Sequence, residues 1–159
     1  MSRKAWIETG APQIRPFDVD LLDTLKADHQ RLLAQTEEIE RILPGLTDPL
    51  NSTVRDRLLD PLQQLITLLK SHDEMERREL FPVLRAHLPE ANEWQVGMME
   101  IEDEMILREA QHLHELASDV SSSVPVARLK ESGARVVRWM RVHVRIEEER
   151  LFPRLQDLP

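Results

Sequence analysis

Apolar residues recur at intervals of three and four positions along most of the chain, a spacing that is typical of amphipathic α-helices. Prolines, glycines and short polar runs divide this pattern into four segments. We expect helices over about residues 18–43, 52–88, 91–120 and 125–151. No segment shows the alternation of apolar and polar residues that favours a β-strand.

Four amphipathic helices with short connections favour an all-α fold, an up-down-up-down four-helix bundle. Residues 1–17 contain a glycine and two prolines and are predicted to form an extended N-terminal arm, with residues 18–159 forming the bundle. The Pro-Gly pair at 44–45 is expected to end the first helix. Pro61 and Pro82 fall inside the second helix, so we expect kinks or a break there.

The apolar face of each predicted helix is interrupted at one level by ionisable side chains. These are His29 in the first helix, His72 and Glu76 in the second, Asp103 in the third, and His143 and Glu147 in the fourth. Counting residues from the connections places these positions at similar heights, within about one turn. Because burying so many ionisable groups without partners is costly, we expect them to share a cation inside the bundle.

Two stretches of the chain nearly repeat each other: HDEMERRELFP begins at His72, and HVRIEEERLFP begins at His143. In each, a glutamate follows the histidine by four positions, so the two side chains lie on one helix face. The residues around His29 also resemble those around Asp103. The chain therefore consists of two similar helical hairpins, which predicts two half-sites facing each other around two ions. Imidazole and carboxylate donors suit iron, manganese or zinc better than calcium or magnesium.

The composition narrows the classes of function. With 41% hydrophobic and 31% charged residues, the chain suits a globular helical domain rather than a disordered one. A formal net charge of −8 without a basic run is a poor match for nucleic acid or an anionic membrane. Cysteine is absent, which excludes thiolate catalysis and thiolate metal sites. With no apolar stretch of signal or membrane-spanning length, we expect a cytoplasmic protein.

The repeated histidine–glutamate stretches ending in Leu-Phe-Pro, together with His29 after Asp28, resemble the hemerythrin-like, or HHE cation-binding, family over about residues 18–155. The resemblance implies a hemerythrin-like bundle around a non-haem di-iron centre that the two glutamates bridge. Members are associated with binding or sensing dioxygen, nitric oxide or iron, with peroxide responses and with iron storage. The expected cofactor is iron, as two ions, with zinc or manganese left open.

The third helix departs from the family pattern, which usually has Glu-His where this chain has Glu102-Asp103. Asp103 can ligate in place of the histidine, which leaves three histidines and three carboxylates. Trp139 lies one turn before His143, where the family often has an aromatic wall, so we expect Trp139 either to pack in the core or to line the pocket for a small ligand. Three acidic neighbours are expected to face solvent, the first of them with a possible further contact to the site: Asp73, Glu148 and Glu149.

Three functions are compatible with this sequence. The leading hypothesis is a non-enzymatic protein that binds or senses a small diatomic ligand or iron, or that buffers iron. The second is a di-iron oxidoreductase acting on peroxide or ferrous iron. The third is a helical interaction module whose metal site is partly lost, with the replacement of the usual histidine by Asp103 as the first sign of that loss. Neither a protein partner nor an oligomeric state is predicted.

Overall fold

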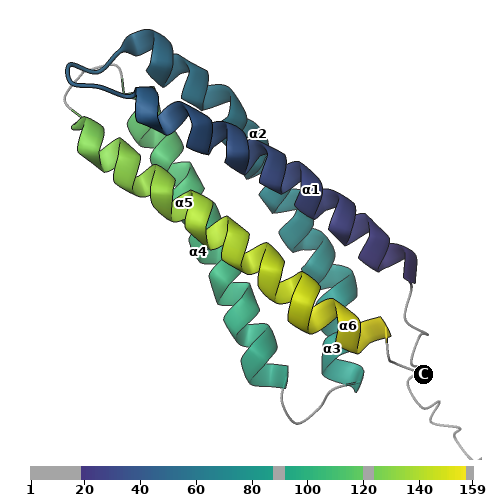
Figure 1. Ribbon diagram of the computed structural model, residues 1–159. Helices are drawn as coiled ribbons and strands as arrows, with labels where there is room; N and C mark the ends of the chain where they lie inside the picture. The colour runs from purple at the N-terminus through teal and green to yellow at the C-terminus, as the bar shows by residue number, and fades with distance from the viewer. Residues whose placement is uncertain (1–18, 88–91, 120–123, 157–159) are drawn as a thin grey trace, which may run out of the picture.

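The computed structural model describes residues 19–87, 92–119 and 124–156 of the 159-residue chain. Over these residues the protein is helical and contains no strand (Figure 1). The four long helices are α1 (Val19–Ile42), α2 (Ser52–Met75), α4 (Asn92–Ser118) and α5 (Val126–Ile146). Shorter segments continue three of them: η1 (Leu43–Gly45) after α1, η2 (Glu76–Leu80) and α3 (Phe81–His87) after α2, and η3 (Glu147–Leu151) and α6 (Phe152–Gln156) after α5. The predicted N-terminal arm, residues 1–17, lies outside the described residues.

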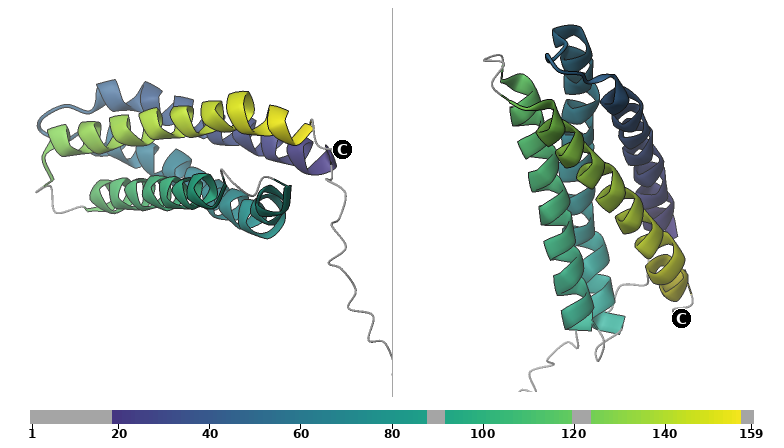
Figure 2. Two further views of the ribbon diagram at one scale, coloured as in Figure 1. Left: turned by 90° about the horizontal axis from the view of Figure 1, so that it is seen from below. Right: turned by 60° about the vertical axis from the view of Figure 1, so that its left-hand side comes forward.

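Each long helix packs against two others to form a bundle. Helices α2 and α5 both contact α1 on one side and α4 on the other. Consecutive long helices run in opposite directions, as the three views in Figures 1 and 2 show. The predicted all-α, up-down-up-down four-helix bundle is confirmed. Because consecutive seams face one another in this arrangement, polar residues at one height on each helix meet at the centre.

Local sequence explains several helix ends. Helix α2 begins after Asn51, whose Oδ1 accepts hydrogen bonds from the N–H groups of Thr53 at 3.0 Å and Val54 at 3.3 Å. Pro44 lies in the 3₁₀ turn η1 that follows α1, close to the predicted end of the first helix. The break that we expected at Pro61 is absent, and α2 runs through it. Pro61 is buried, and its packing offsets the single hydrogen bond that its missing N–H removes.

Each Leu-Phe-Pro triplet follows a widened turn rather than a helix end. Segments η2 and η3 are π-helical, and in each the phenylalanine N–H donates to the carbonyl of the glutamate five residues earlier, Glu76 or Glu147. An α-helical turn would press the ring of Pro82 or Pro153 against the carbonyl four residues before it, and the wider turn relieves that contact. Pro82 therefore follows a π turn, and the break that we expected there is absent because the helix continues as α3.

The apolar interior consists of two clusters. The long cluster fills the part of the bundle toward η1 and includes Leu32, Leu69, Ile106 and Val144. The end cluster has as its buried members Leu22, Leu25, Leu80, Phe81, Leu84, Val96, Leu151, Phe152 and Leu155. Both Leu-Phe pairs of the repeat thus lie in the end cluster. On every long helix, the ionisable residues of the seam fall between the two clusters.

Charged side chains join neighbouring helices on the outside of the bundle. Arg141 on α5 donates to both carboxylate oxygens of Glu40 on α1, at 2.9 and 2.5 Å. Glu109 on α4 accepts hydrogen bonds from two α5 side chains, Arg135 Nη2 at 2.9 Å and Ser132 Oγ at 2.5 Å. Exposed pairs contribute about 1 kcal/mol or less each, so packing dominates the stability of the bundle. In the described parts of the chain, no helix is both long and apolar enough to cross a membrane.

Candidate metal centre

Six ionisable side chains from the four helical rods meet in the layer between the long cluster and the end cluster. All six are buried, with at most 4% of any residue exposed. Their donor atoms form two overlapping groups, and within each group the atoms all lie within 4.8 Å of one another. One group is His29, His72, His143 and Glu147, and the other is Glu76, Asp103, His143 and Glu147. The structure therefore brings together every metal-ligand candidate that was taken from the sequence.

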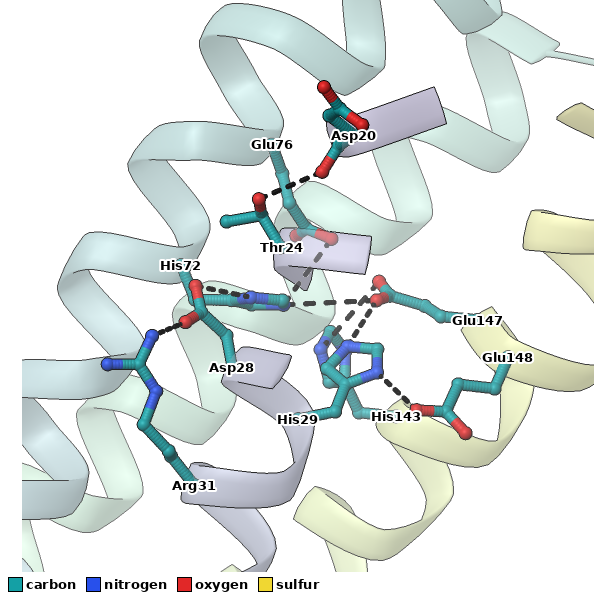
Figure 3. A network of polar contacts seen from close by, with 10 residues as sticks. All are labelled: Asp20, Thr24, Asp28, His29, Arg31, His72, Glu76, His143, Glu147 and Glu148. Atoms are coloured by element: carbon teal, nitrogen blue, oxygen red, sulfur yellow. Dashed lines mark hydrogen bonds and ion pairs between the residues drawn. The ribbon is translucent and has the colours of Figure 1, made fainter. Parts of the chain in front are cut away.

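Glu147 lies among the three imidazole rings (Figure 3). Its Oε2 is 3.0 Å from His29 Nε2 and 3.8 Å from His72 Nε2, while its Oε1 is 3.7 Å from His143 Nε2. Glu76 Oε1 approaches His72 Nε2 at 3.4 Å. The ring centroids lie 4.9 to 6.0 Å apart. The Nε2 atoms of all three histidines thus face the two glutamates that the repeat places one turn after His72 and His143.

The opposite ring nitrogen, Nδ1, faces a carboxylate in each of the three histidines. The pairs are Glu148 Oε1 with His29 at 2.9 Å, Asp103 Oδ1 with His143 at 3.3 Å, and Asp28 Oδ2 with His72 at 3.9 Å. Arg31 donates to the other oxygen of Asp28 and so fixes this carboxylate in place. A carboxylate beside Nδ1 favours the tautomer with its proton on Nδ1, which leaves the Nε2 lone pair for a metal ion.

Buried polar atoms without hydrogen-bond partners are concentrated in the layer. They include both carboxylate oxygens of Asp73, Glu76 and Asp103, both ring nitrogens of His72, and the single atoms Glu147 Oε1 and His143 Nε2. Unpartnered buried polar atoms are rare in folded proteins, because each costs roughly 1–3 kcal/mol. Their concentration in one layer indicates that this layer binds a group which satisfies them.

Burial changes the ionisation of these carboxyl groups. Burial, followed by the charges of Asp73 and Glu147, raises the pKa of Asp103 to about 9. Burial likewise raises the pKa of Asp73 to about 6 and that of Glu76 well above its usual value. Burial also acts to raise the pKa of Glu147, but the surrounding histidines outweigh it and the pKa is lowered. A bound cation would displace the protons from the raised groups, because metal ligation requires the ionised carboxylate.

The donors present fit a first-row metal ion. Imidazole and carboxylate together suit iron, manganese and zinc, and no thiolate is present to select a softer ion. The buried acids of the layer are Asp28, Asp73, Glu76, Asp103 and Glu147, of which Asp28 is paired with Arg31. When ionised, the other four carry four negative charges, which two divalent ions would neutralise. Donor chemistry, burial and unpartnered atoms together indicate a metal-binding site.

Three acidic residues at this level were not among the predicted ligands: Asp28 contacts His72, Glu148 contacts His29, and Asp73 is buried. Our expectation that Asp73 and Glu148 face solvent is wrong. Asp73 is 1% exposed, and Glu148 is one-third exposed and pairs with His29. Glu149 is exposed, as expected. Each of the three missed residues is adjacent in sequence to a candidate ligand, and this adjacency was the signal that could have found them.

An open groove of about 320 Å³ lies between α4 and α5 and reaches His143. Trp139, which we expected to pack in the core or to line a ligand pocket, is half-buried against the long cluster and forms one wall of this groove. Among the described residues, the exposed large hydrophobic side chains all line it: Met98, Ile101, Met105 and Val142. The sequence did not predict the groove, because most of these residues lie beside rather than on the apolar seams of α4 and α5.

Comparison with known proteins gives one match. No curated protein and no solved structure matches the chain significantly. The family model for the hemerythrin HHE cation binding domain matches residues 20–155. This span includes the four long helices almost completely and every donor of the two groups. The chain therefore belongs to the hemerythrin HHE cation-binding domain family.

Proposed function

We propose that the protein binds two iron ions in the layer between its apolar clusters. We further propose that it uses this non-haem di-iron site to bind or sense dioxygen, nitric oxide or iron, or to buffer iron. The observation that carries the proposal is the buried donor set, three histidines and three carboxylates with atoms grouped within 4.8 Å. Such a set is costly to bury on its own, and a pair of cations offsets that cost.

The proposed ligands are His29, His72, Glu76, Asp103, His143 and Glu147. Glu147 is suited to bridge two ions, because its Oε2 faces His29 and His72 while its Oε1 faces His143. We propose iron because mixed imidazole and carboxylate donors suit it and because the family resemblance implies it. Manganese and zinc can use the same donors, so metal identity is part of the test.

The chain itself would prepare the site for a small ligand. Bound iron supplies redox chemistry and affinity for diatomic molecules. Phe152 stacks on His29 with ring centroids 5.5 Å apart and planes 6° apart, and with the rest of the end cluster it keeps water from that side. The groove beside Trp139 and His143 is the proposed path for the ligand. Its apolar walls favour dioxygen or nitric oxide over charged solutes.

Two sequence features support the proposed setting of the protein. The absence of cysteine suits a reducing compartment, so we propose a cytoplasmic location. The net charge of −8 disfavours nucleic acid and anionic membranes as partners. The proposed partners are accordingly metal ions and a small diatomic ligand.

Metal analysis with a visible absorption spectrum tests the function. Protein produced with iron should hold about two iron ions per chain and be coloured in air. The double variant His72→Ala, His143→Ala should lose most of both the metal and the absorption. His114→Ala is the matched control, because this half-buried histidine on α4 belongs to neither donor group. A colourless wild-type protein with well under one metal ion per chain would contradict the proposal and favour an interaction module with a lost site.

The carboxylate-rich side of the layer favours a second candidate, a di-iron oxidoreductase. Asp73 and Asp103 add negative charge beside Glu76 and Glu147, which stabilises the more highly charged ferric state. Peroxide consumption, or ferrous iron oxidation by dioxygen, should then proceed faster with wild-type protein than with the double histidine variant. Equal rates for the two proteins would exclude this candidate while leaving the binding function intact.

A further inference from the structure

The two oxygens of Glu147 face unlike sets of donors. On the Oε2 side lie His29 and His72, and we call this the imidazole subsite. On the Oε1 side lies His143, which also forms a donor group with Asp103, Glu76 and Glu147, and we call this the carboxylate subsite. Glu76 contacts His72 at 3.4 Å and also groups with Asp103, so it belongs to both sides. The pseudo-symmetric repeat has therefore produced an asymmetric centre.

Asp73 is a further buried carboxyl group, next in sequence to the proposed ligand His72. It is 1% exposed, and neither of its oxygens has a hydrogen-bond partner. Arg77 Nη2 lies 4.0 Å from Asp73 Oδ2, and the Arg77 side chain is 55% exposed. After burial, the charge of Asp73 contributes most to the raised pKa of Asp103. The carboxylate subsite thus has one imidazole and a surplus of buried carboxyl groups.

Metal ions differ in what they gain from these two donor sets. Zinc gains strongly from imidazole nitrogen, whereas manganese prefers carboxylate oxygen and gains less from nitrogen. In a buried layer, each additional carboxylate also attracts a divalent ion more strongly than it would in water. The imidazole subsite should therefore fill first with a nitrogen-preferring ion, and the carboxylate subsite should discriminate least against manganese.

We propose that the centre holds two unlike ions, with an oxygen-preferring ion such as Mn²⁺ or ferric iron selected at the carboxylate subsite by Asp103 and Asp73. This inference rests on the proposed metal-binding function and deepens it. The inference explains why Asp103 stands where the family usually has a histidine. Asp103 would set the metal preference of the carboxylate subsite. The imidazole subsite remains the tighter one.

Competition between Zn²⁺ and Mn²⁺ tests the inference without any activity assay, since neither ion is oxidised by air at neutral pH. Chelated full-length protein is incubated with one equivalent of Zn²⁺ per chain and an excess of Mn²⁺, because excess zinc would occupy any site of nitrogen and oxygen donors. The protein is then desalted and analysed for each metal. Wild-type protein should retain about one zinc and one manganese ion per chain, with Mn²⁺ giving the electron paramagnetic resonance spectrum of a protein-bound ion. Retention of zinc without manganese would overturn the inference.

Asp103→His identifies the residue responsible. Its second subsite should hold Mn²⁺ less tightly, lowering manganese retention by about tenfold or more. Glu104→His is the matched control, since Glu104 is the exposed neighbour of Asp103 on α4, and it should leave both metals unchanged. An unchanged metal ratio in Asp103→His would overturn the inference.

Asp73→Asn keeps all six proposed ligands and replaces only the carboxyl group of Asp73 with a neutral amide. It should lower Mn²⁺ retention while zinc retention stays at the wild-type level, and equal loss of both metals would count against the inference. This variant decides the matter if Asp103→His does not fold. Wild-type protein that retains neither metal would instead overturn the proposed function itself, so the two failures are distinguishable.

Discussion

At the scale of single residues, each histidine of the site faces carboxylates with both of its ring nitrogens. Each Nε2 faces Glu76 or Glu147, and each Nδ1 faces a second carboxylate. The sequence was sufficient to select the six buried residues that converge in the layer, because a histidine or carboxylate on an apolar seam needs a partner. It was insufficient for Asp28, Asp73 and Glu148, because one position to the side of a seam can be either solvated or buried. Only the width of the assembled interior decides between these outcomes.

Asp103 should make the stability of the chelated, metal-free protein depend on pH. Its pKa of about 9 means that the folded state keeps a proton that the unfolded state releases near pH 4. The free energy of unfolding should therefore fall between pH 7 and 9, by roughly 1 kcal/mol per pH unit. His29 acts in the same direction: burial lowers its pKa, but contacts with Glu147 and Glu148 more than offset this and raise it. Burial lowers the pKa of His143, which is then neutral in both states over this range.

Urea unfolding at several pH values measures this dependence. Asp103→Asn has no such proton to lose, so its free energy of unfolding should fall less steeply between pH 7 and 9. Parallel curves for wild-type and variant protein would show that Asp103 is already ionised in the folded chain. Samples must contain chelator throughout, because a bound cation displaces the same proton.

At the scale of elements, the periodic pattern predicted the four helices and their order but not their local geometry. The prolines of this chain affect helix geometry in different ways. Pro61 lies inside the α-helix α2, whereas Pro82 and Pro153 follow π turns. The residues alone cannot separate these cases, because each outcome depends on what packs against the strained turn. In the two π turns, the widened backbone brings a Leu-Phe pair into the end cluster directly beyond a candidate glutamate ligand.

Two glycines inside helices give a matched test of packing. An added Cβ at Gly97 on α4 meets nothing within 4 Å, so Gly97→Ala should stabilise the protein by about 0.5–1 kcal/mol through helix propensity. At Gly133 on α5 the same Cβ would lie 2.5 Å from Leu43 Cδ2. Gly133→Ala should therefore destabilise, since overpacking costs about 1–3 kcal/mol and exceeds the propensity gain. Denaturant unfolding of both variants measures the difference, and stabilisation by both would mean that Leu43 moves aside freely.

At the scale of the whole molecule, the duplicated hairpin could be predicted from the sequence, because the two half-sites have similar spacings, 43 residues from His29 to His72 and 40 from Asp103 to His143. Topology followed from it, since only antiparallel neighbours bring His29, His72 and His143 together. The groove between α4 and α5 could not be predicted from the sequence, because it is formed by two helix surfaces whose separation depends on their packing. Its exposed residues, such as Ile101 and Met105, look like isolated surface hydrophobes along one helix.

Metal should stabilise the whole bundle, because the ligands come from all four helical rods and converge only in the folded state. Free metal at a hundredfold excess over its dissociation constant should add about 2.7 kcal/mol for each site, seen as a higher melting temperature than in chelator. The His72→Ala, His143→Ala variant should melt at the same temperature with and without chelator. If wild-type protein also shows no difference, metal does not bind preferentially to the folded chain.

The division of the apolar interior into two clusters also determines where the protein would open. The end cluster takes five of its nine buried side chains from α1, η3 and α6, and the other four from η2, α3 and α4. A small cluster of this kind can open locally while the larger core stays folded. A bound metal ion would link the two clusters. It would then leave by transient opening of the end cluster, at a rate set by local motion rather than by unfolding of the bundle.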